Sequence, residues 1–109
     1  MATNTFTRYV TKNVGTTANT MVTAGANTQT TVIGLSLSNT TTGTITANVF
    51  ITASAVNYYI VQNATIASGG ALVLFGGDGK LVLTTGDAFK VQTNTANSSD
   101  AILSVLQIT

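Results

Sequence analysis

The fold class follows from Thr31-Val-Ile-Gly-Leu-Ser-Leu-Ser-Asn39, where apolar residues recur at every second position. Successive side chains on a β-strand point to opposite faces, so one face is expected to carry Ile33, Leu35 and Leu37. The opposite face then carries Val32, Gly34, Ser36 and Ser38. The stretch Thr44–Ala53 alternates in the same way, with its apolar positions at Ile45, Ala47, Val49 and Ile51. Both stretches predict half-buried strands.

The rest of the chain also favours strands over helices. Thr alone makes up about a fifth of the residues, and β-branched side chains fit a pleated sheet better than a helix because their χ1 angle is restricted. Short alternating or apolar runs predict seven further strands: Phe6–Val14, Thr20–Thr23, Asn57–Gln62, Ala71–Phe75, Leu81–Leu83, Ala88–Thr93 and Ala101–Ile108.

Turn-forming residues separate these runs at a spacing of roughly 8 to 12 residues, which is typical of a sandwich or a small barrel. A length of 109 residues suits one hydrophobic core. We therefore predict an all-β fold, an antiparallel, jelly-roll-like β-sandwich in a single domain over residues 1–109. The polar segment Met1–Thr5 has no evident partner strand, and we expect it to be a short N-terminal arm that is mobile in the free subunit.

Charge is scarce in this sequence. Only 6% of the residues are charged and the net charge is +1, against about 25% charged residues in ordinary soluble domains. Thr, Asn, Ser and Gly cover the remaining surface, and a protein so close to neutrality has little electrostatic repulsion to keep its copies apart. We expect a homo-oligomer, with a trimer favoured.

Several classes of partner are not expected. The four cations, Arg8, Lys12, Lys80 and Lys90, are scattered, so no basic patch for nucleic acid is predicted. The start of the chain lacks the cationic and apolar regions of a signal peptide, and no run approaches the roughly 18 apolar residues of a membrane helix. We expect no nucleic-acid or membrane partner, and synthesis in a host cytoplasm. There is no Cys for disulfides or thiolate metal sites.

Two predicted strands are apolar on both faces. Ala71–Phe75 places Leu72 and Leu74 opposite Val73 and Phe75, and Ala101–Ile108 places Ile102, Leu106 and Ile108 opposite Leu103 and Val105. An antiparallel strand in a small domain usually shows one face to water, so the second faces are candidates for a subunit contact. We expect the wider set of Ile102, Leu106 and Ile108 in the core. The candidate interface is therefore Val73, Phe75, Leu103 and Val105, unless these are central strands under a loop.

Residues for catalysis are missing. Nucleophilic catalysis needs a base beside Ser, Thr or Cys, and the chain has no His, Cys or Glu. The aspartates do not cluster, so acid–base work would need Asp78 and Asp87 to meet in space. We predict no enzyme, no cofactor and no metal site. The run Asn94–Asp100 offers oxygen ligands for Ca²⁺ but has a single carboxylate, so a solvated loop is favoured.

Three local features have structural explanations. Gly76-Gly-Asp78-Gly79 predicts a tight hairpin turn rather than a phosphate or metal loop. Thr84-Thr85-Gly86-Asp87 predicts a turn in which the Asp side chain binds nearby backbone donors. Tyr58 and Tyr59 fall on opposite faces of one strand, so one ring can enter the core while the other contacts a sugar or, as we favour, a partner subunit.

From Thr30 onward, about three quarters of the chain resembles small virion proteins of tailed phages, including those of marine and cyanobacterial phages. The pieces that carry the resemblance are Thr31–Asn39, Tyr58-Tyr-Ile-Val-Gln-Asn-Ala-Thr-Ile-Ala-Ser-Gly69, and Lys80-Leu-Val-Leu-Thr-Thr-Gly-Asp87 with Phe89-Lys-Val91. The resemblance implies a β-sandwich subunit mounted on a phage particle. No catalytic residue is carried over.

The function expected on these grounds is that of a non-enzymatic phage virion protein, a capsid decoration or cement protein that bridges shell subunits. Its partner would be the major capsid protein or another virion protein, and its location the virion. A neck or tail component is an alternative within the same class. A host-surface carbohydrate-binding module, using an exposed Tyr and Asn-rich loops, is an alternative from a different class.

Overall fold

The computed structural model describes residues 4–26, 28–75 and 80–108, and these residues form strands without helices. Each of the nine predicted stretches is a strand, as we predicted, with ends that shift by up to four residues, most at β5. The strands are β1 (Asn4–Val14), β2 (Asn19–Thr23), β3 (Gln29–Asn39), β4 (Ile45–Ala53), β5 (Val56–Ile66), β6 (Ala71–Leu74), β7 (Leu81–Leu83), β8 (Ala88–Thr93) and β9 (Ser99–Ile108).

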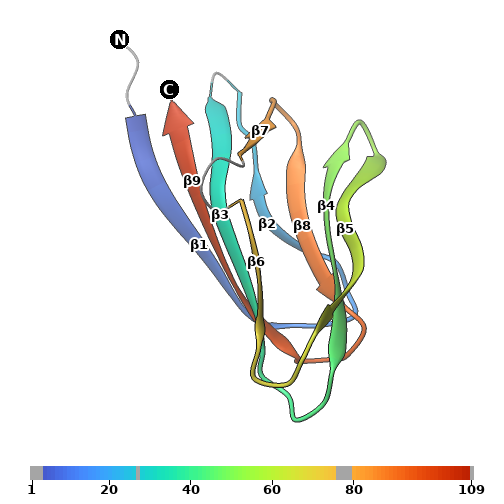
Figure 1. Ribbon diagram of the computed structural model, residues 1–109. Coiled ribbons are helices and arrows are strands. Elements are labelled where there is room, and N and C mark those ends of the chain that lie inside the picture. Colours follow the sequence, from blue (N-terminus) through green and yellow to red (C-terminus); the bar gives the residue numbers. More distant parts are fainter. Residues whose placement is uncertain (1–3, 27, 76–79, 109) are drawn as a thin grey trace.

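The strands form two antiparallel sheets that pack face to face (Figure 1). One sheet has the order β1-β9-β3-β6, with β7 also paired to β3, and the other has the order β2-β8-β4-β5. Outside the β4–β5 hairpin and the β6–β7 break, each connection passes from one sheet to the other. With β6 and β7 counted as one interrupted edge strand, this is the eight-strand arrangement of a jelly roll. The predicted fold is confirmed.

The predicted hairpin between Phe75 and Leu81 is wrong. Its turn residues, 76–79, lie outside the described part of the chain. The flanking strands, however, do not pair with each other: β6 lies along Leu35–Ser38 and β7 along Thr30–Val32, both antiparallel to β3. Two strands antiparallel to the same strand run in the same direction, so they extend one edge instead of folding back.

The core lies between the two sheets, where large side chains from each sheet are fully buried, among them Leu37, Val49, Phe89 and Leu103. The predicted inward set of β3 is right at two of its three positions. Leu35 and Leu37 are buried, but Val32 replaces Ile33 in the core. The pairing of β3 with β9 shifts between Val32 and Gly34, so the extra residue of this bulge exchanges the faces on its N-terminal side.

The predicted N-terminal arm, Met1–Thr5, is wrong at its last two residues. Asn4 and Thr5 belong to β1 and pair with Ile108 and Gln107 of β9. Met1–Thr3 lie outside the described residues. The prediction failed at Asn4 and Thr5 because these residues are polar, and the signal for an edge strand came only from Phe6 onward.

Candidate assembly surface

Strand β9 is apolar on both faces, and the structure reverses our assignment of them. Leu103 and Val105 are fully buried in the subunit core, packed toward the β2-β8-β4-β5 sheet, while Ile102 is exposed on the opposite face. Leu106 and Ile108, which share a face with Ile102, are half-buried and do not join the core cluster. Leu103 and Val105 are therefore core residues, and a neighbouring subunit does not reach them in the folded domain.

The register of the first sheet brings other apolar residues beside Ile102. Residues directly opposite in an antiparallel pair share a face. One cross-strand row on the outside of the sheet therefore runs from β1 to β6: Val10, Ile102, Ser36 and Val73. A second row runs from β1 to β7: Phe6, Leu106, Thr31 and Val82. We call the side of the β1-β9-β3-β6 sheet that carries both rows the outer face.

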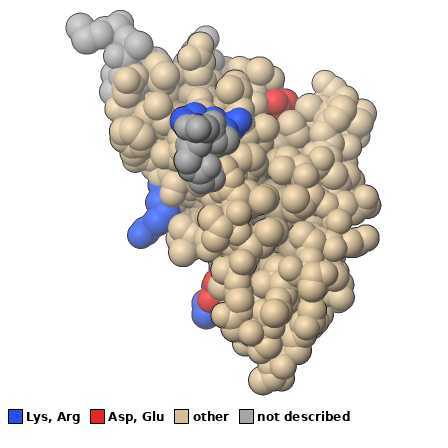
Figure 2. Space-filling view, in the orientation of Figure 1, with Lys and Arg blue, Asp and Glu red and all other residues tan. Residues whose placement is uncertain are grey.

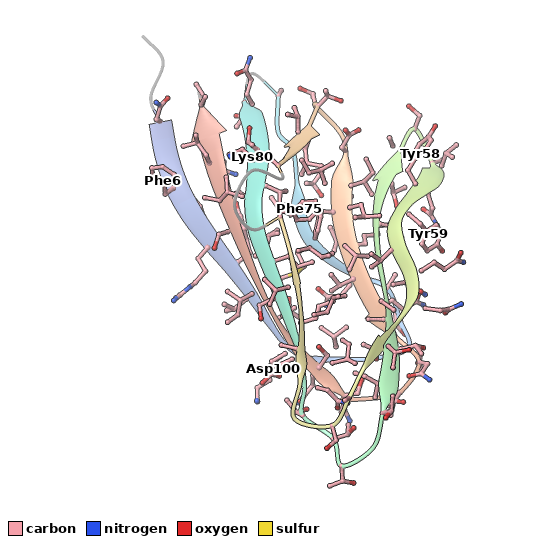
Figure 3. The ribbon with its side chains drawn as sticks, in the orientation of Figure 1. Phe6, Tyr58, Tyr59, Phe75, Lys80 and Asp100 are labelled. Atoms are coloured by element: carbon pink, nitrogen blue, oxygen red, sulfur yellow. The ribbon has the colours of Figure 1, made fainter. Side chains whose placement is uncertain are left out.

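Five large apolar side chains of the outer face are exposed to solvent. The exposed fractions are 74% for Phe6, 67% for Val73, 64% for Val82, 61% for Val10 and 46% for Ile102. Figure 3 marks the place of Phe6 on β1. Single exposed apolar residues are ordinary, but several gathered in two adjoining rows form the kind of patch that marks an interaction site.

The outer face has relief. On this face β9 presents the large residues Ile102, Leu106 and Ile108 with Ser104 and Asp100 among them, and the neighbouring β3 presents Thr31, Gly34, Ser36 and Ser38, with Ile33 half-buried outside the core at the bulge. A methyl group placed on Gly34 would meet no atom within 4 Å, so the space above this part of β3 is open. The face thus carries its large apolar side chains mainly on β9 and β1, and small ones on most of β3.

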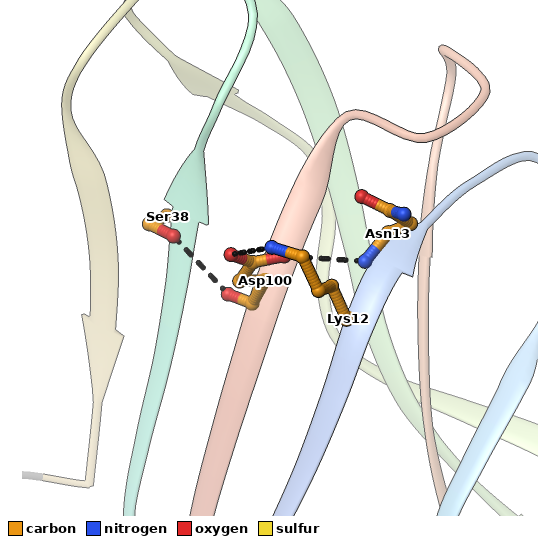
Figure 4. A network of polar contacts seen from close by, with 4 residues as sticks. All are labelled: Lys12, Asn13, Ser38 and Asp100. Atoms are coloured by element: carbon orange, nitrogen blue, oxygen red, sulfur yellow. Dashed lines mark hydrogen bonds and ion pairs between the residues drawn. The ribbon is translucent and has the colours of Figure 1, made fainter.

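Charged groups lie at one end of the outer face, in the row between the two apolar rows, and beside β7, where exposed Lys80 precedes Leu81. Lys12 and Asp100 form an ion pair at 3.2 Å, and the Asp100 carboxylate also accepts a hydrogen bond from the backbone N–H of Asn13 (Figure 4). These contacts, the N–H bond first, lower the pKa of Asp100 from its ordinary value of 3.8. Arg8 lies opposite Ser104, between the apolar rows. Charged groups are few and separated on the side of the molecule seen in Figure 2.

Phe75 and Val73 differ in position, although both were candidate interface residues. Val73 is exposed on the outer face. Phe75 has a positive φ of 62° and turns toward the core, where its ring meets Phe89 edge-on with a centroid separation of 6.2 Å. The strand alternation stops at Leu74, so the period-2 pattern placed Phe75 on the wrong side.

The tyrosines of β5 form a second exposed group. Tyr59 pairs with Phe50 and Tyr58 with Ile51, so they lie on opposite faces, as predicted. Neither ring enters the core, which corrects the expectation for one of them: both are exposed, and Tyr59 leans on Phe50 with ring centroids 4.9 Å apart. In Figure 3 both tyrosines lie on β5, at an edge of the β2-β8-β4-β5 sheet and away from β1.

The described residues line several surface hollows, three of which bear on the candidate sites. A polar hollow of about 320 Å³ is lined by residues 13–19 with Ala96 and Asn97, and one of about 440 Å³ by Thr28, Gln29, Thr31 and residues 82–85. A third, of about 280 Å³ and mostly apolar, lies between β1 and β9 on the outer face and is lined by Val10, Ile102 and their neighbours toward Lys12 and Asp100.

The Asp87 and Asp100 carboxylates bind local backbone and side-chain groups. Across residues 4–26, 28–75 and 80–108, no three His, Cys, Asp or Glu side chains gather at one place. In the run Asn94–Asp100, residues 94–97 are exposed, but Ser98 and Ser99 are buried, and the Asp100 carboxylate is engaged with Lys12 and Asn13. The Asp87 carboxylate accepts hydrogen bonds from the N–H and hydroxyl of Thr84, as we predicted for that turn. The described part of the chain contains no helix long and apolar enough to cross a membrane.

Neither a protein-family model nor a curated protein sequence matches this chain. Solved structures share its fold. A chain of the Bacillus endospore appendages, which form disulfide-linked pili, superposes with a TM-score of 0.56 at 12% identity, covering 98% of this chain and 88% of that one. A chain in the acidic stable capsid of Helicobacter pylori bacteriophage KHP30 superposes with a TM-score of 0.52 at 12% identity. The match covers 100% of this chain and 94% of the KHP30 chain. A chain of the IBDV viral particle superposes with a TM-score of 0.55 at 10% identity. The match covers 98% of this chain but only 34% of the IBDV chain.

Proposed function

We propose that this protein is a non-enzymatic structural subunit of a phage virion, a decoration or cement protein that stabilises the shell by bridging its subunits. The neck or tail of the particle is the alternative location. The mechanism is mechanical: repeated copies bury apolar surface against one another and against the shell, and the buried area resists separation of the parts.

The observation that carries this proposal is the outer face. Phe6, Val10, Val73, Val82 and Ile102 are exposed together on one side of a jelly-roll sheet, although the core behind that sheet is already complete. Such a surface contributes little to the stability of a lone subunit and leaves apolar area in contact with water. Association with a neighbouring protein removes this apolar area from water.

The fold comparisons support the virion class over the pilus class for this chain. Two of the similar folds occur in viral particles. The third occurs in pili that are linked by disulfides, and the 109 residues contain no cysteine, so that mode of linkage is not available. Since identities of 10 to 12% establish the fold alone, the proposal rests on the outer face and uses the comparisons as support.

The test is binding to the parent particle. Purified protein, mixed with empty capsids and separated on a sucrose gradient, is expected in the capsid fractions and at a fixed number of copies in a cryo-electron micrograph. If the protein stays at the top of the gradient when it is mixed with capsids, with necks or with tails, the proposal is refuted. Light scattering on the free protein measures its own association; the trimer favoured by the sequence remains a prediction.

A carbohydrate-binding role has one observation in its favour, the two exposed tyrosines of β5. Tyrosine rings can stack on sugars, and jelly rolls occur in lectins as well as in capsids. The three hollows described above do not include either tyrosine. Binding on a glycan array that is lost in Tyr58→Ala but kept in Ile102→Ala would favour this function over the virion role.

A further inference from the structure

We propose that β1 pairs edge to edge with β1 of a second copy of this chain, antiparallel and with Tyr9 at the two-fold axis, so that two β1-β9-β3-β6 sheets become one continuous sheet. This inference deepens the proposed structural role, on which it rests, by naming a contact between copies. It follows from the edges of the two sheets, from the hollow beside β1 and from the charges on that strand.

Strand β1 is a long and regular sheet edge. Its pairing with β9 continues without a shift from Asn4 to Thr11, and in Figure 1 it forms the outer border of its sheet. An edge strand leaves a row of backbone N–H and C=O groups without partners, and natural proteins protect such rows with short strands, bulges or prolines. The 109 residues contain no proline, and β1 is neither short nor bulged between Asn4 and Thr11. This edge is therefore open to another strand.

The other edges formed by the described residues carry the protection that β1 lacks. Strand β2 has 5 residues, and its pairing with β8 shifts between Thr20 and Val22. Strands β6 and β7 have 4 and 3 residues. Strand β5 is long, but its pairing with β4 shifts twice between Ala47 and Phe50, and bulges twist an edge away from a partner. A second copy of β1 is thus the strand of this chain that best matches β1 in length and regularity.

Phe6 and the apolar hollow beside Val10 select the register. Phe6 is 74% exposed, and the hollow of about 280 Å³ between β1 and β9 includes Val10, Lys12 and Ile102 in its lining. With Tyr9 opposite Tyr9 of the partner subunit, the partner's Phe6 lies opposite Lys12 on the same outer face. Its ring then reaches a hollow with room for roughly nine water molecules at about 30 Å³ each. Filling the hollow removes both the ring and the apolar lining from water.

The inward side of the strand suits the same register. Thr7 would lie opposite the partner's Thr11, and Tyr9 opposite the partner's Tyr9. Aromatic pairs and Thr–Thr pairs are among the favourable cross-strand neighbours in antiparallel sheets. An axis at Thr7 instead would set Phe6 opposite Arg8 and leave the hollow unfilled.

Charge excludes the registers in which the axis lies at Arg8 or at Val10. The first would place Arg8 opposite itself and the second would place it opposite the partner's Lys12, and like charges directly opposite destabilise a sheet. The axis at Tyr9 places Arg8 opposite Val10, so the two arginines are diagonal neighbours at roughly 7 to 8 Å. Lys12 is paired with Asp100. The exposed Arg8 side chains can extend apart into solvent.

The other charged groups among the described residues lie away from the contact. Lys80 precedes β7, which is three strands from β1, or roughly 14 Å at about 4.8 Å a strand. Asp87 is bonded to Thr84 in the turn after β7. Lys90 lies between the buried Phe89 and Val91 on β8 and so points away from the core on the other sheet. The contact itself uses Phe6–Lys12 of each copy.

This pairing leaves the outer face available to the particle. A two-fold axis perpendicular to the sheet keeps the outer faces of both copies on the same side. Val73 and Val82, at the other edge of the sheet, stay exposed. The dimer therefore presents two adjoining apolar surfaces to the shell and binds it through both at once.

The test is disulfide cross-linking, because the chain has no cysteine of its own and a short edge contact forms a weak dimer that a covalent bond captures. Arg8→Cys and Val10→Cys, mixed in equal amounts and oxidised, place the two cysteines directly opposite each other, within the Cα separation of about 4.4 to 6.8 Å that a disulfide needs. In either variant alone the cysteines are diagonal and too far apart. The mixture should therefore cross-link about tenfold faster than either variant alone. Val10→Cys mixed with Val56→Cys, an exposed valine of β5, is the matched control and should not cross-link.

Phe6→Ala, added to both partners, tests the hollow. Half-burial of each ring is worth about tenfold in association, so the loss of two rings should slow cross-linking by about a hundredfold. The thermal melt should not change, because Phe6 is exposed in the free subunit. Tyr58→Ala, which removes an exposed ring from β5, should leave the rate of cross-linking unchanged.

The pattern of cross-links decides the proposal. A mixture that does not cross-link, Arg8→Cys alone that cross-links as fast as the mixture, or a rate unaffected by Phe6→Ala would overturn it. If the cross-link fails but the protein sediments with capsids, this inference fails and the virion role stands. If the cross-link forms as expected but the protein binds no part of the particle, the virion role fails and the contact stands.

Discussion

Leu103→Ala should destabilise the subunit far more than Ile102→Ala, although the two residues are neighbours on β9. Leu103 is fully buried between the two sheets, and its partners across the strands are Tyr9 on β1 and Leu35 on β3. Ile102 is 46% exposed on the outer face. Both substitutions remove a similar volume from a central strand, so the comparison isolates the face on which the side chain lies.

The magnitude follows from burial. Each substitution removes three carbons, which at about 0.8 kcal/mol for each buried methylene amounts to about 2.4 kcal/mol for Leu103. The hydrogen-bonded strands on both sides of β9 prevent full collapse, and a residual void adds up to about 2 kcal/mol, giving a loss of about 3 to 4.5 kcal/mol. Ile102 loses roughly half of the transfer free energy and leaves no void, because its site opens to solvent, so its loss should be about 1 kcal/mol.

The measurement is urea unfolding followed by circular dichroism, at a protein concentration low enough that both variants are monomers. Under these conditions a contact between copies contributes nothing to the free energy of unfolding. Equal losses for the two variants, or a larger loss for Ile102→Ala, would refute the assignment of Leu103 to the core and of Ile102 to the outer face. An unchanged slope with urea is the control for an intact cooperative core.

Three further substitutions test single polar groups. The hydroxyl of Thr30 is buried and has no hydrogen-bond partner among the described residues, so Thr30→Val should raise stability by about 1 kcal/mol in thermal melts; an equal loss would contradict this. The Asn39 amide donates to the carbonyl oxygens of Gly43 and Ile66 at 2.7 and 3.0 Å, so Asn39→Ala should cost about 2 kcal/mol in urea unfolding, and a neutral result would show that water replaces it. Because the Asn13 N–H and Lys12 lower the pKa of Asp100, its contribution is complete above the ordinary pKa of 3.8 and lost as the pH falls through the lowered value. The stability difference between the unmodified protein and Asp100→Asn should be small, because the pair is exposed, and should vanish in acid; a difference independent of pH would exclude the carboxylate as its source.

The positions of the strands could be predicted from the sequence because they depend on local chemistry. Alternation along Thr31–Asn39 and Thr44–Ala53, with Gly, Asn and Ser between the runs, is sufficient to locate them. The turn at Thr84–Asp87 was predictable for the same reason, since the Asp87 side chain reaches donors only three residues away. Both the donor and the acceptor are visible within one short segment of sequence.

Features that depend on long-range pairing could not be predicted in this way. The bulge at Ile33 and Gly34 is a property of the pairing between β3 and β9, which are far apart in the sequence. The shared edge of β6 and β7 likewise depends on β3, and the local Asp-Gly sequence indicated a hairpin instead. Alternation also fails where a strand ends, as it does just before Phe75.

The reversed faces of β9 arose from the same property that marks the assembly surface. We expected the wider apolar set in the core, a rule that holds when the other face needs only to be soluble. Small polar residues would meet that need, and β3 uses them at Ser36 and Ser38. Strand β9, in the same sheet and at the same level, presents Ile102 and Leu106 instead. Large apolar side chains on a face that the core does not use give a lone subunit no benefit, but they stabilise a contact that covers them. The residues that make the folding pattern ambiguous are therefore the residues expected to carry assembly.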